Sequence, residues 1–100
     1  KLKLVYVENE VGWIPFYAHE WDKYFVRHGP KAPLPYMKKL PGEYIKDQVY
    51  ATFFSDPAGG RMMDWFGEDT FMWSSDYPHA NMTWQNSRAF IARQIGDLDI

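Results

Sequence analysis

Asp76 and His79 lie three residues apart, directly after an apolar run, in the segment Phe71–His79. An apolar run of this length predicts a buried strand, and side chains at the carboxyl end of a strand point into the shared mouth of a parallel barrel. A carboxylate in that position can bind a metal ion and can accept the proton of a water that the metal activates. Asp76 is therefore the first candidate for chemistry. Its alternative role is to cap the turn before Pro78, which aspartate does readily.

Glu8 and His79 are the next candidates. Glu8 ends the apolar run at 2–7, and three roles are open for it: orienting an attacking water, binding a cationic group, or forming a structural ion pair with Arg27 or a lysine. His79 can contact substrate, hydrogen-bond a metal ligand from the second shell, or fix the loop backbone. Glu10 is expected to be solvated.

The elements that must position these residues alternate between strands and helices. Runs rich in β-branched and aromatic residues predict strands at 2–7, 49–54 and 71–74, the first of them buried on both sides. Repeated strand and helix units imply a parallel sheet with right-handed crossovers. Tyr50, Thr52 and Phe54 are expected to face one side of the sheet, with Phe54, Ser55 and Asp56 nearest the mouth.

The first helix is expected to run from Ile14 to about His28, with Pro15 near its start and Gly29 at its carboxyl cap. Its apolar stripe is predicted to contain Ile14, Tyr17, Ala18, Trp21, Tyr24 and Phe25. His19, in the middle of this helix, and His28, at its end, are expected to be structural or solvent-facing.

The remaining helices are shorter. Residues 30–41 contain four prolines and predict an irregular loop within one domain, with single helical turns at 36–39 and 42–45; a linker between domains is the alternative. Ser55 or Asp56 is expected to cap a helix that starts at Pro57 and ends at Gly67. Its core face is predicted to include Met62, Met63, Trp65 and Phe66, and a final helix carries Phe90, Ile91 and Ile95.

Composition excludes several classes of function. The chain has 100 residues, 46% of them apolar, and a formal charge of -2, so no basic surface is available to neutralise the phosphates of a nucleic acid. It has no apolar run long enough for a membrane span and no signal-peptide pattern, so a cytoplasmic protein is expected. The absence of cysteine leaves histidine nitrogen and carboxylate oxygen as metal ligands.

Ser75–His79, followed by a loop and a helix, resembles the last strand and loop of amidohydrolase-related metal-dependent enzymes, a family that includes aminocarboxymuconate-semialdehyde decarboxylase-like carboxy-lyases. The segments Leu2–Pro15 and Gln48–Phe54 resemble the family's sixth and seventh strands, in the same order. The resemblance implies an α/β fold in which residues 1–100 are the carboxyl-terminal strand-helix units, about strands 6 to 8, of a TIM (β/α)₈ barrel.

The same resemblance implies a divalent metal ion, usually Zn²⁺, with Asp76 as a metal ligand and the remaining ligands, histidines from earlier strands, outside this chain. Decarboxylase-like relatives carry a histidine and a glycine-rich turn where this sequence has Glu8, a departure that leaves hydrolysis or another lyase reaction open. The expectation is therefore a fragment of a metal-dependent hydrolase or carboxy-lyase, inactive alone, whose full-length form can be a homo-oligomer.

The rival interpretation is a small α/β binding domain that folds by itself and grips a partner with exposed aromatic side chains. It is encouraged by the aromatic content, which includes five Trp, seven Tyr and seven Phe. Trp13 and Trp84, in the loops after two predicted strands, can line a substrate pocket or cover the core.

Overall fold

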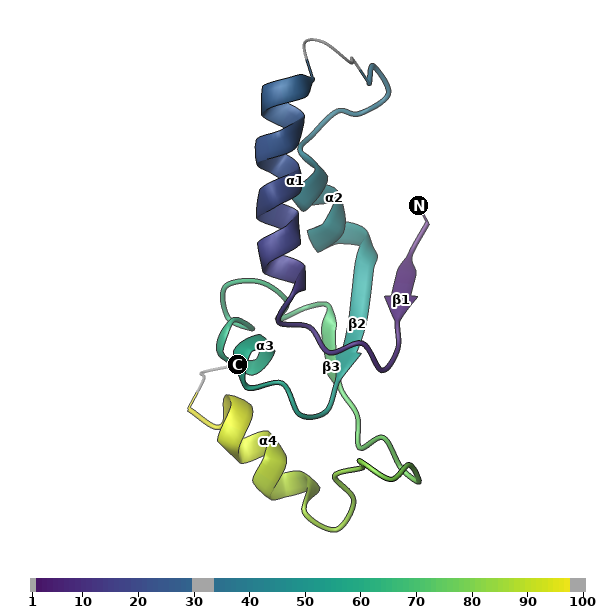
Figure 1. The fold of residues 1–100 in the computed structure, drawn as a ribbon, viewed down its shortest axis with the longest axis vertical. Helices are drawn as coiled ribbons and strands as arrows, with labels where there is room; N and C mark the ends of the chain where they lie inside the picture. Colours follow the sequence, from purple (N-terminus) through teal and green to yellow (C-terminus); the bar gives the residue numbers. More distant parts are fainter. Residues whose placement is uncertain (1, 30–33, 98–100) are drawn as a thin grey trace.

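The computed structural model describes residues 2–29 and 34–97. Helices and strands alternate along the chain, with one additional helix before the second strand (Figure 1). The elements are β1 (Leu4–Tyr6), α1 (Ile14–His28), α2 (Pro41–Gln48), β2 (Val49–Phe53), α3 (Pro57–Arg61), β3 (Phe71–Trp73) and α4 (Ser87–Ile95). The predicted mixed α/β class is confirmed, while the assignment to strands 6 to 8 of a barrel stays a prediction.

The three strands form one parallel sheet in the order β1-β2-β3. Ala51 in β2 is level with Tyr6 on one side and with Phe71 on the other. Because neighbouring parallel strands are in register, residues at the same level lie on the same face of the sheet. All three strands therefore end at one edge, and the loops after them meet there.

The two faces of the sheet differ. Ala51 and Phe53 are fully buried against the helices, and Phe71 belongs to the same core. The alternate residues, such as Thr52 and Met72, lie on the opposite face, where Met72 is exposed and no described helix covers the sheet. Only one face of the sheet thus contributes to the core.

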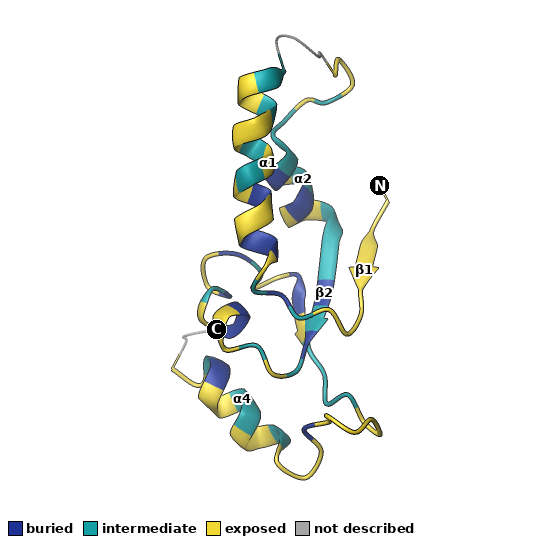
Figure 2. Ribbon diagram, in the orientation of Figure 1, coloured by how far each residue is buried: buried dark blue, intermediate teal, exposed yellow. Residues whose placement is uncertain are grey.

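β1 corrects the expectation of a strand buried on both sides, because all three of its residues are exposed. As the edge strand it has β2 on one side only, and Figure 2 shows it exposed along its length while β2 is partly buried. An apolar run specifies a strand that can be buried, but the neighbours that bury it must come from elsewhere.

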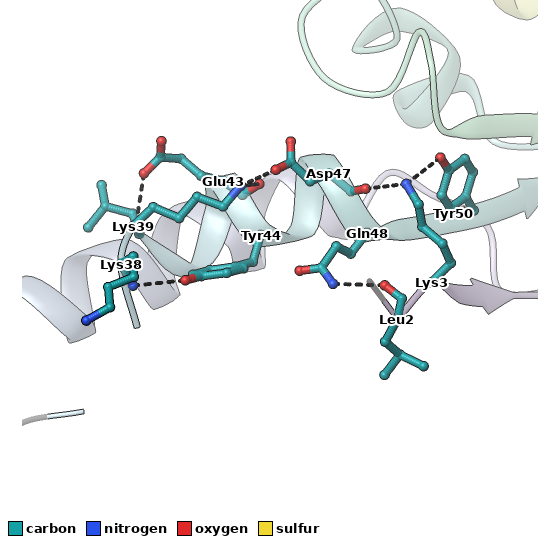
Figure 3. A network of polar contacts seen from close by, with 10 residues as sticks. Leu2, Lys3, Lys38, Lys39, Glu43, Tyr44, Asp47, Gln48 and Tyr50 are labelled. Carbon is teal, nitrogen blue, oxygen red and sulfur yellow. Dashed lines mark hydrogen bonds and ion pairs between the residues drawn. The ribbon is translucent and has the colours of Figure 1, made fainter. Parts of the chain in front are cut away.

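Polar contacts fix the beginning of β1 to the corner between α2 and β2 (Figure 3). The Lys3 ammonium group donates to the Asp47 carbonyl oxygen at 2.6 Å and to the Tyr50 hydroxyl at 2.8 Å. Gln48 donates to the Leu2 carbonyl oxygen at 2.8 Å. These contacts lie at the amino end of the sheet, away from the edge where the loops meet.

α1 begins and ends where the sequence predicts, with Pro15 in its first turn and Gly29 at its carboxyl cap. Its apolar stripe is only partly buried: Ile14 and Ala18 lie in the core. The stripe's aromatic members Tyr17, Trp21 and Tyr24 are exposed. The described helix that packs against α1 is α2, a short helix that lies beside only part of the length of α1 (Figure 1).

α2 is a full helix rather than the single turn predicted at 42–45. Glu43 accepts a hydrogen bond from the Leu40 backbone N–H at 2.8 Å and so caps the helix start. The predicted helical turn at 36–39 is instead a turn closed by the Met37 N–H on the Leu34 carbonyl oxygen. The part of the predicted loop at 30–33 lies outside the described residues.

α3 is shorter than predicted, because it ends at Arg61 and a series of turns continues to Thr70. Met63 and Phe66 are buried as expected, but Trp65 is 62% exposed, which corrects its placement in the core. Glycines at the third and fourth positions of α3 lower its helix propensity. α4 follows the predicted final helix and packs against α3.

Candidate metal centre

Glu8, Asp76 and His79 meet at the carboxyl edge of the sheet. One ligand atom from each lies within 4.8 Å of the other two. The Nδ1 atom of His79 is 2.9 Å from Oδ1 of Asp76 and 3.9 Å from Oε1 of Glu8. The three residues singled out in the sequence are therefore neighbours in space, although 68 positions separate Glu8 from Asp76.

The three side chains differ in access to solvent. The Asp76 side chain is 5% exposed, whereas those of Glu8 and His79 are 52% and 56% exposed. A nearly buried carboxylate requires a cation or hydrogen-bond donors to offset its lost hydration. The His79 imidazole supplies that contact when Nδ1 carries a proton.

Two of the three residues have strained backbone conformations. Glu8 and Asp76 have φ angles of 59° and 56°, as does Glu10 at 52° and, outside the site, Gln85 at 72°. Residues other than glycine enter this left-handed region at a cost of about 1 to 2 kcal/mol, which is smaller for aspartate than for glutamate. Such strain persists where the surroundings enforce it, and it is concentrated at functional sites.

β1 and β3 do not touch, so their loops must cross the end of β2 to bring Glu8 to Asp76. Two strand spacings amount to about 9.6 Å. Thr52 bridges part of this distance, since its hydroxyl oxygen accepts the Glu8 backbone N–H at 2.9 Å. The loop after β1 therefore lies over β2.

Glu10 holds the same loop, which corrects the expectation that it is solvated. Its two carboxylate oxygens accept hydrogen bonds from the Phe54 N–H at 3.2 Å and the Ser55 N–H at 3.3 Å. Phe54 and Ser55 follow β2 directly. Glu10 therefore joins the loop after β1 to the loop after β2.

Asp56 caps α3 as predicted, with its carboxylate accepting the Gly59 N–H at 2.8 Å. The same carboxylate also accepts the N–H groups of Val11 at 2.8 Å and Gly12 at 2.6 Å, from the loop after β1. Burial alone would raise the pKa of Asp56, but the backbone N–H donors from Gly59, Val11 and Gly12 outweigh it and lower the pKa.

Gln94 of α4 is a buried polar residue in contact with this region. Its side-chain oxygen accepts the Asp56 N–H at 2.5 Å, and its side-chain nitrogen donates to the Phe54 carbonyl oxygen at 3.0 Å. A buried amide is stable in such a place only when its donors and acceptors are paired. α4 is thereby attached to the loop after β2.

The aromatic residues suggested as pocket walls occupy the surroundings of the site. Trp13 donates to the Asn9 carbonyl oxygen at 3.0 Å and packs edge-on against Tyr6. Trp84 is exposed, and its ring centroid lies 5.2 Å from that of Tyr77. Neither Trp13 nor Trp84 is buried in the core.

Arg27, His19 and His28 lie on α1, outside the cluster. His19 is exposed, and His28 is half-buried beside the Tyr24 ring at 4.6 Å, in line with the expected structural or solvent-facing roles. In the described part of the chain, the ion pair of Glu8 is with His79 rather than with Arg27 or a lysine.

The donor set fits a divalent cation. Two carboxylates and an imidazole are ligands that zinc accepts, and a catalytic zinc site has three protein ligands and an open position. Ligand atoms of a tetrahedral zinc site lie about 3.3 Å apart, given zinc–ligand distances of about 2.0 to 2.2 Å. The separations of 2.9 and 3.9 Å from His79 bracket that value.

Sequence reasoning missed Thr52, Glu10 and Gln94 as residues that support the site. Thr52 lies in the predicted second strand and Glu10 in the loop after the first, but their hydrogen bonds depend on which loops meet at the sheet edge. Gln94 carries one signal in the sequence: it is a polar residue directly before Ile95, on the side of α4 that packs inward.

Among residues 2–29 and 34–97, no helix combines the length and apolar character needed to cross a lipid bilayer.

Comparison with protein-family profiles and with curated proteins finds no match for this chain.

Proposed function

We propose that Glu8, Asp76 and His79 form part of a divalent-metal site, and that the chain contributes three strand-helix units to a metal-dependent hydrolase or carboxy-lyase. Its substrate would be a small organic acid, amide or ester. The observation that carries the proposal is the convergence of two carboxylates and one imidazole within 4.8 Å at the carboxyl edge of a parallel sheet. Ligands bind at this edge in parallel α/β folds.

Charge supports a cation at this position. Glu8 and Asp76 bring two acidic groups together, and Asp76 is almost removed from solvent. Two neighbouring carboxylates repel each other when both are ionised, unless a cation lies between them. The Nδ1 atom of His79 lies 2.9 Å from Asp76 and 3.9 Å from Glu8, so a cation bound between the two carboxylates would also be close to this imidazole.

The proposed roles follow from exposure. A divalent metal ion in such a site polarises substrate oxygens and makes water a better nucleophile. Asp76, nearly buried, would hold the metal and accept a proton from the attacking water. Glu8, on the exposed side, would orient that water or the substrate, and His79 would keep the Asp76 carboxylate in place.

The uncovered sheet face supports the barrel assignment. In a TIM barrel one face of the sheet packs against helices and the other points into the barrel interior. Here the helices cover the face of Ala51 and Phe53, while Met72 on the other face is exposed. Further strands would supply both the missing neighbours and the missing histidine ligands.

The test is a Zn²⁺ titration of this chain against a chromogenic chelator, with Asp76→Asn as the variant. We expect the variant to bind Zn²⁺ at least about tenfold more weakly, since changes merely beside a metal ligand cost 10- to 100-fold. Asp97→Asn is the matched control, because Asp97 is an exposed acid whose carboxylate pairs with Arg61. Equal affinities in the parent and Asp76→Asn would contradict the proposal, as would a parent that binds no Zn²⁺.

A binding domain is the second candidate, favoured by the exposed aromatic side chains of α1. Phe16 and Tyr24 are 60% and 66% exposed, and Trp21 is also exposed. Such a surface is typical of a contact with another polypeptide. A cooperative thermal transition of a monomer, together with absent Zn²⁺ binding, would favour this function over the enzyme.

A further inference from the structure

We infer that Asp56, together with Gln94, is a positioning pair that keeps Glu8 within reach of Asp76 and His79 by joining the three loops at the carboxyl edge of the sheet. The inference rests on the proposed function for the consequence in metal binding. The joining of the loops is geometric and can be measured without a metal.

Asp56 performs more than a helix cap. A cap requires one hydrogen bond to its own helix, which the Gly59 N–H supplies. Two further N–H groups, from Val11 and Gly12, reach the same carboxylate from 45 and 44 residues earlier in the chain. Because charge-assisted hydrogen bonds are about twice as strong as neutral ones, these contacts fix the loop after β1 against the start of α3.

The loop after β1 and the start of α3 are in close contact at Gly59. A Cβ atom built on Gly59 would lie 2.3 Å from Cγ2 of Val11 and 2.7 Å from Oδ2 of Asp56. Both distances are far below van der Waals contact, so the two loops touch through the glycine backbone. The position of Val11 is therefore determined by Asp56 and Gly59.

Glu8 depends on this attachment because it lies three residues before Val11. Its own contact with the sheet is one backbone hydrogen bond to Thr52, and its side chain is half exposed. The 3.9 Å separation between Glu8 Oε1 and His79 Nδ1 therefore depends on where the loop places the Glu8 backbone. Release of Val11 and Gly12 would leave the loop attached through Thr52 and through the Glu10 hydrogen bonds to Phe54 and Ser55, so Glu8 would be held less firmly beside Asp76 and His79.

Gln94 connects Asp56 to the third loop, which carries Asp76. From α4, its side-chain oxygen accepts the Asp56 N–H and its side-chain nitrogen donates to the Phe54 carbonyl oxygen. The segment before α4 is attached to the residues before Asp76, because the N–H of the buried Thr83 donates to the Ser75 carbonyl oxygen at 2.9 Å. The hydroxyl of Ser87, the first residue of α4, donates to the Thr83 carbonyl oxygen at 3.1 Å. The path from Asp56 through α4 therefore ends one residue before the buried carboxylate.

The experiment is a double-mutant cycle in Zn²⁺ affinity with the parent, Glu8→Gln, Asp56→Asn and the double variant. Asn at position 56 retains one acceptor but presents an amide NH₂ group to backbone donors. We expect Asp56→Asn to weaken Zn²⁺ binding about tenfold. The double variant should bind no more weakly than the weaker-binding single variant, because both changes remove the contribution of Glu8 to the site. Full additivity of the two losses, or an unchanged affinity in Asp56→Asn, would overturn the inference.

Asp22→Asn is the matched control. The half-buried Asp22 carboxylate accepts the Gly42 N–H at 2.7 Å and joins α1 to α2, away from the sheet edge. This variant loses a carboxylate-to-backbone hydrogen bond of the same kind, so its melting temperature should fall while its Zn²⁺ affinity stays unchanged. A general loss of stability would affect both variants equally.

A metal-free measurement separates this inference from the proposed function. In the parent, nuclear Overhauser contacts between the Glu8 methylene protons and the His79 ring should be present, and in Asp56→Asn they should be lost, with retention in Asp22→Asn. If Asp56→Asn does not fold, Gln94→Met, which preserves side-chain volume and removes the hydrogen bonds to Asp56, Phe54 and Phe90, should weaken the same contacts. Persistence of the contacts in the folded variant would overturn the positioning role, whether or not the parent binds Zn²⁺. Absence of Zn²⁺ binding by the parent would contradict only the metal site.

Discussion

At the scale of single residues, Glu8 and Asp76 illustrate how similar acids acquire different environments. Asp76 is nearly buried and in contact with an imidazole, whereas Glu8 is half exposed at the rim of the same cluster. Removing the charge of a buried carboxylate weakens its attraction to a nearby cation more than removing the charge of an exposed carboxylate does, because solvent screens the exposed group. The two acids should therefore not contribute equally to binding of a cation.

Replacing Glu8 with Gln tests this difference. The change keeps size and hydrogen-bonding capacity, so Zn²⁺ affinity should fall by less than in Asp76→Asn, and the melting temperature should change little. In an assembled, active enzyme the same variant should lower kcat if Glu8 orients the water.

Chelator competition and thermal melting of both variants provide the comparison. A purely structural ion pair between Glu8 and His79 makes the opposite prediction, with a lower melting temperature and an unchanged Zn²⁺ affinity. That result would remove Glu8 from the site and leave Asp76 with His79.

At the scale of elements, α3 is a short helix whose start carries more polar contacts than its length requires. The Asp56 carboxylate accepts three backbone N–H groups, and these donors lower its pKa despite burial. An acid whose pKa is lowered by folding binds fewer protons in the folded state than in the unfolded state. Its contribution to stability is therefore present above the ordinary aspartate pKa of 3.8 and is lost as the pH falls through the folded-state pKa.

Asp56→Asn should consequently destabilise the fold at neutral pH and much less in acid. Asn caps a helix about as well as Asp, so the expected cost arises at the bonds to Val11 and Gly12, where a neutral acceptor contributes about 1 kcal/mol less per hydrogen bond than a charged one. Melting curves of the parent and the variant between neutral pH and pH values below 3.8 would show the two curves converging in acid. A difference in melting temperature that stays constant over this range would mean that the charge of Asp56 does not contribute.

At the scale of the whole molecule, the chain is extended rather than compact. Its dimensions are 52 × 26 × 21 Å and its radius of gyration is 15.8 Å, compared with about 13 Å for a compact domain of 100 residues. Within residues 2–29 and 34–97 the core contains nine buried apolar residues, while many large apolar side chains on β1 and α1 remain exposed. The molecule therefore has surface that further strands and helices, or another polypeptide, would cover.

The isolated chain should self-associate, because β1 offers an unpaired apolar edge. Val5 is 57% exposed in the middle of that strand, and a lysine there would place a charge on the edge and oppose pairing. We expect sedimentation to show the parent as associated and Val5→Lys as less associated at equal concentration. Cooperative melting of a parent that sediments as a monomer would contradict the view that the chain contributes strands to a larger barrel.

The sequence by itself determined the local elements. The start of α1 at Ile14 with Pro15, the extent of β2 and the capping of α3 by Asp56 follow from residue preferences that act over a few positions. The polar residues after the apolar runs likewise indicated Glu8, Asp76 and His79, because parallel strands bring their carboxyl ends to one edge.

Only the tertiary structure decided which neighbours these elements have. Burial depends on the partner, so the apolar run of β1 and the aromatic stripe of α1 are exposed although their sequences permit burial. The same reason explains Glu10 and Gln94, whose partners lie 44 and 38 residues away. Periodicity and propensity record what a segment can do locally, whereas the meeting of three loops over the end of β2 depends on contacts that no local pattern encodes.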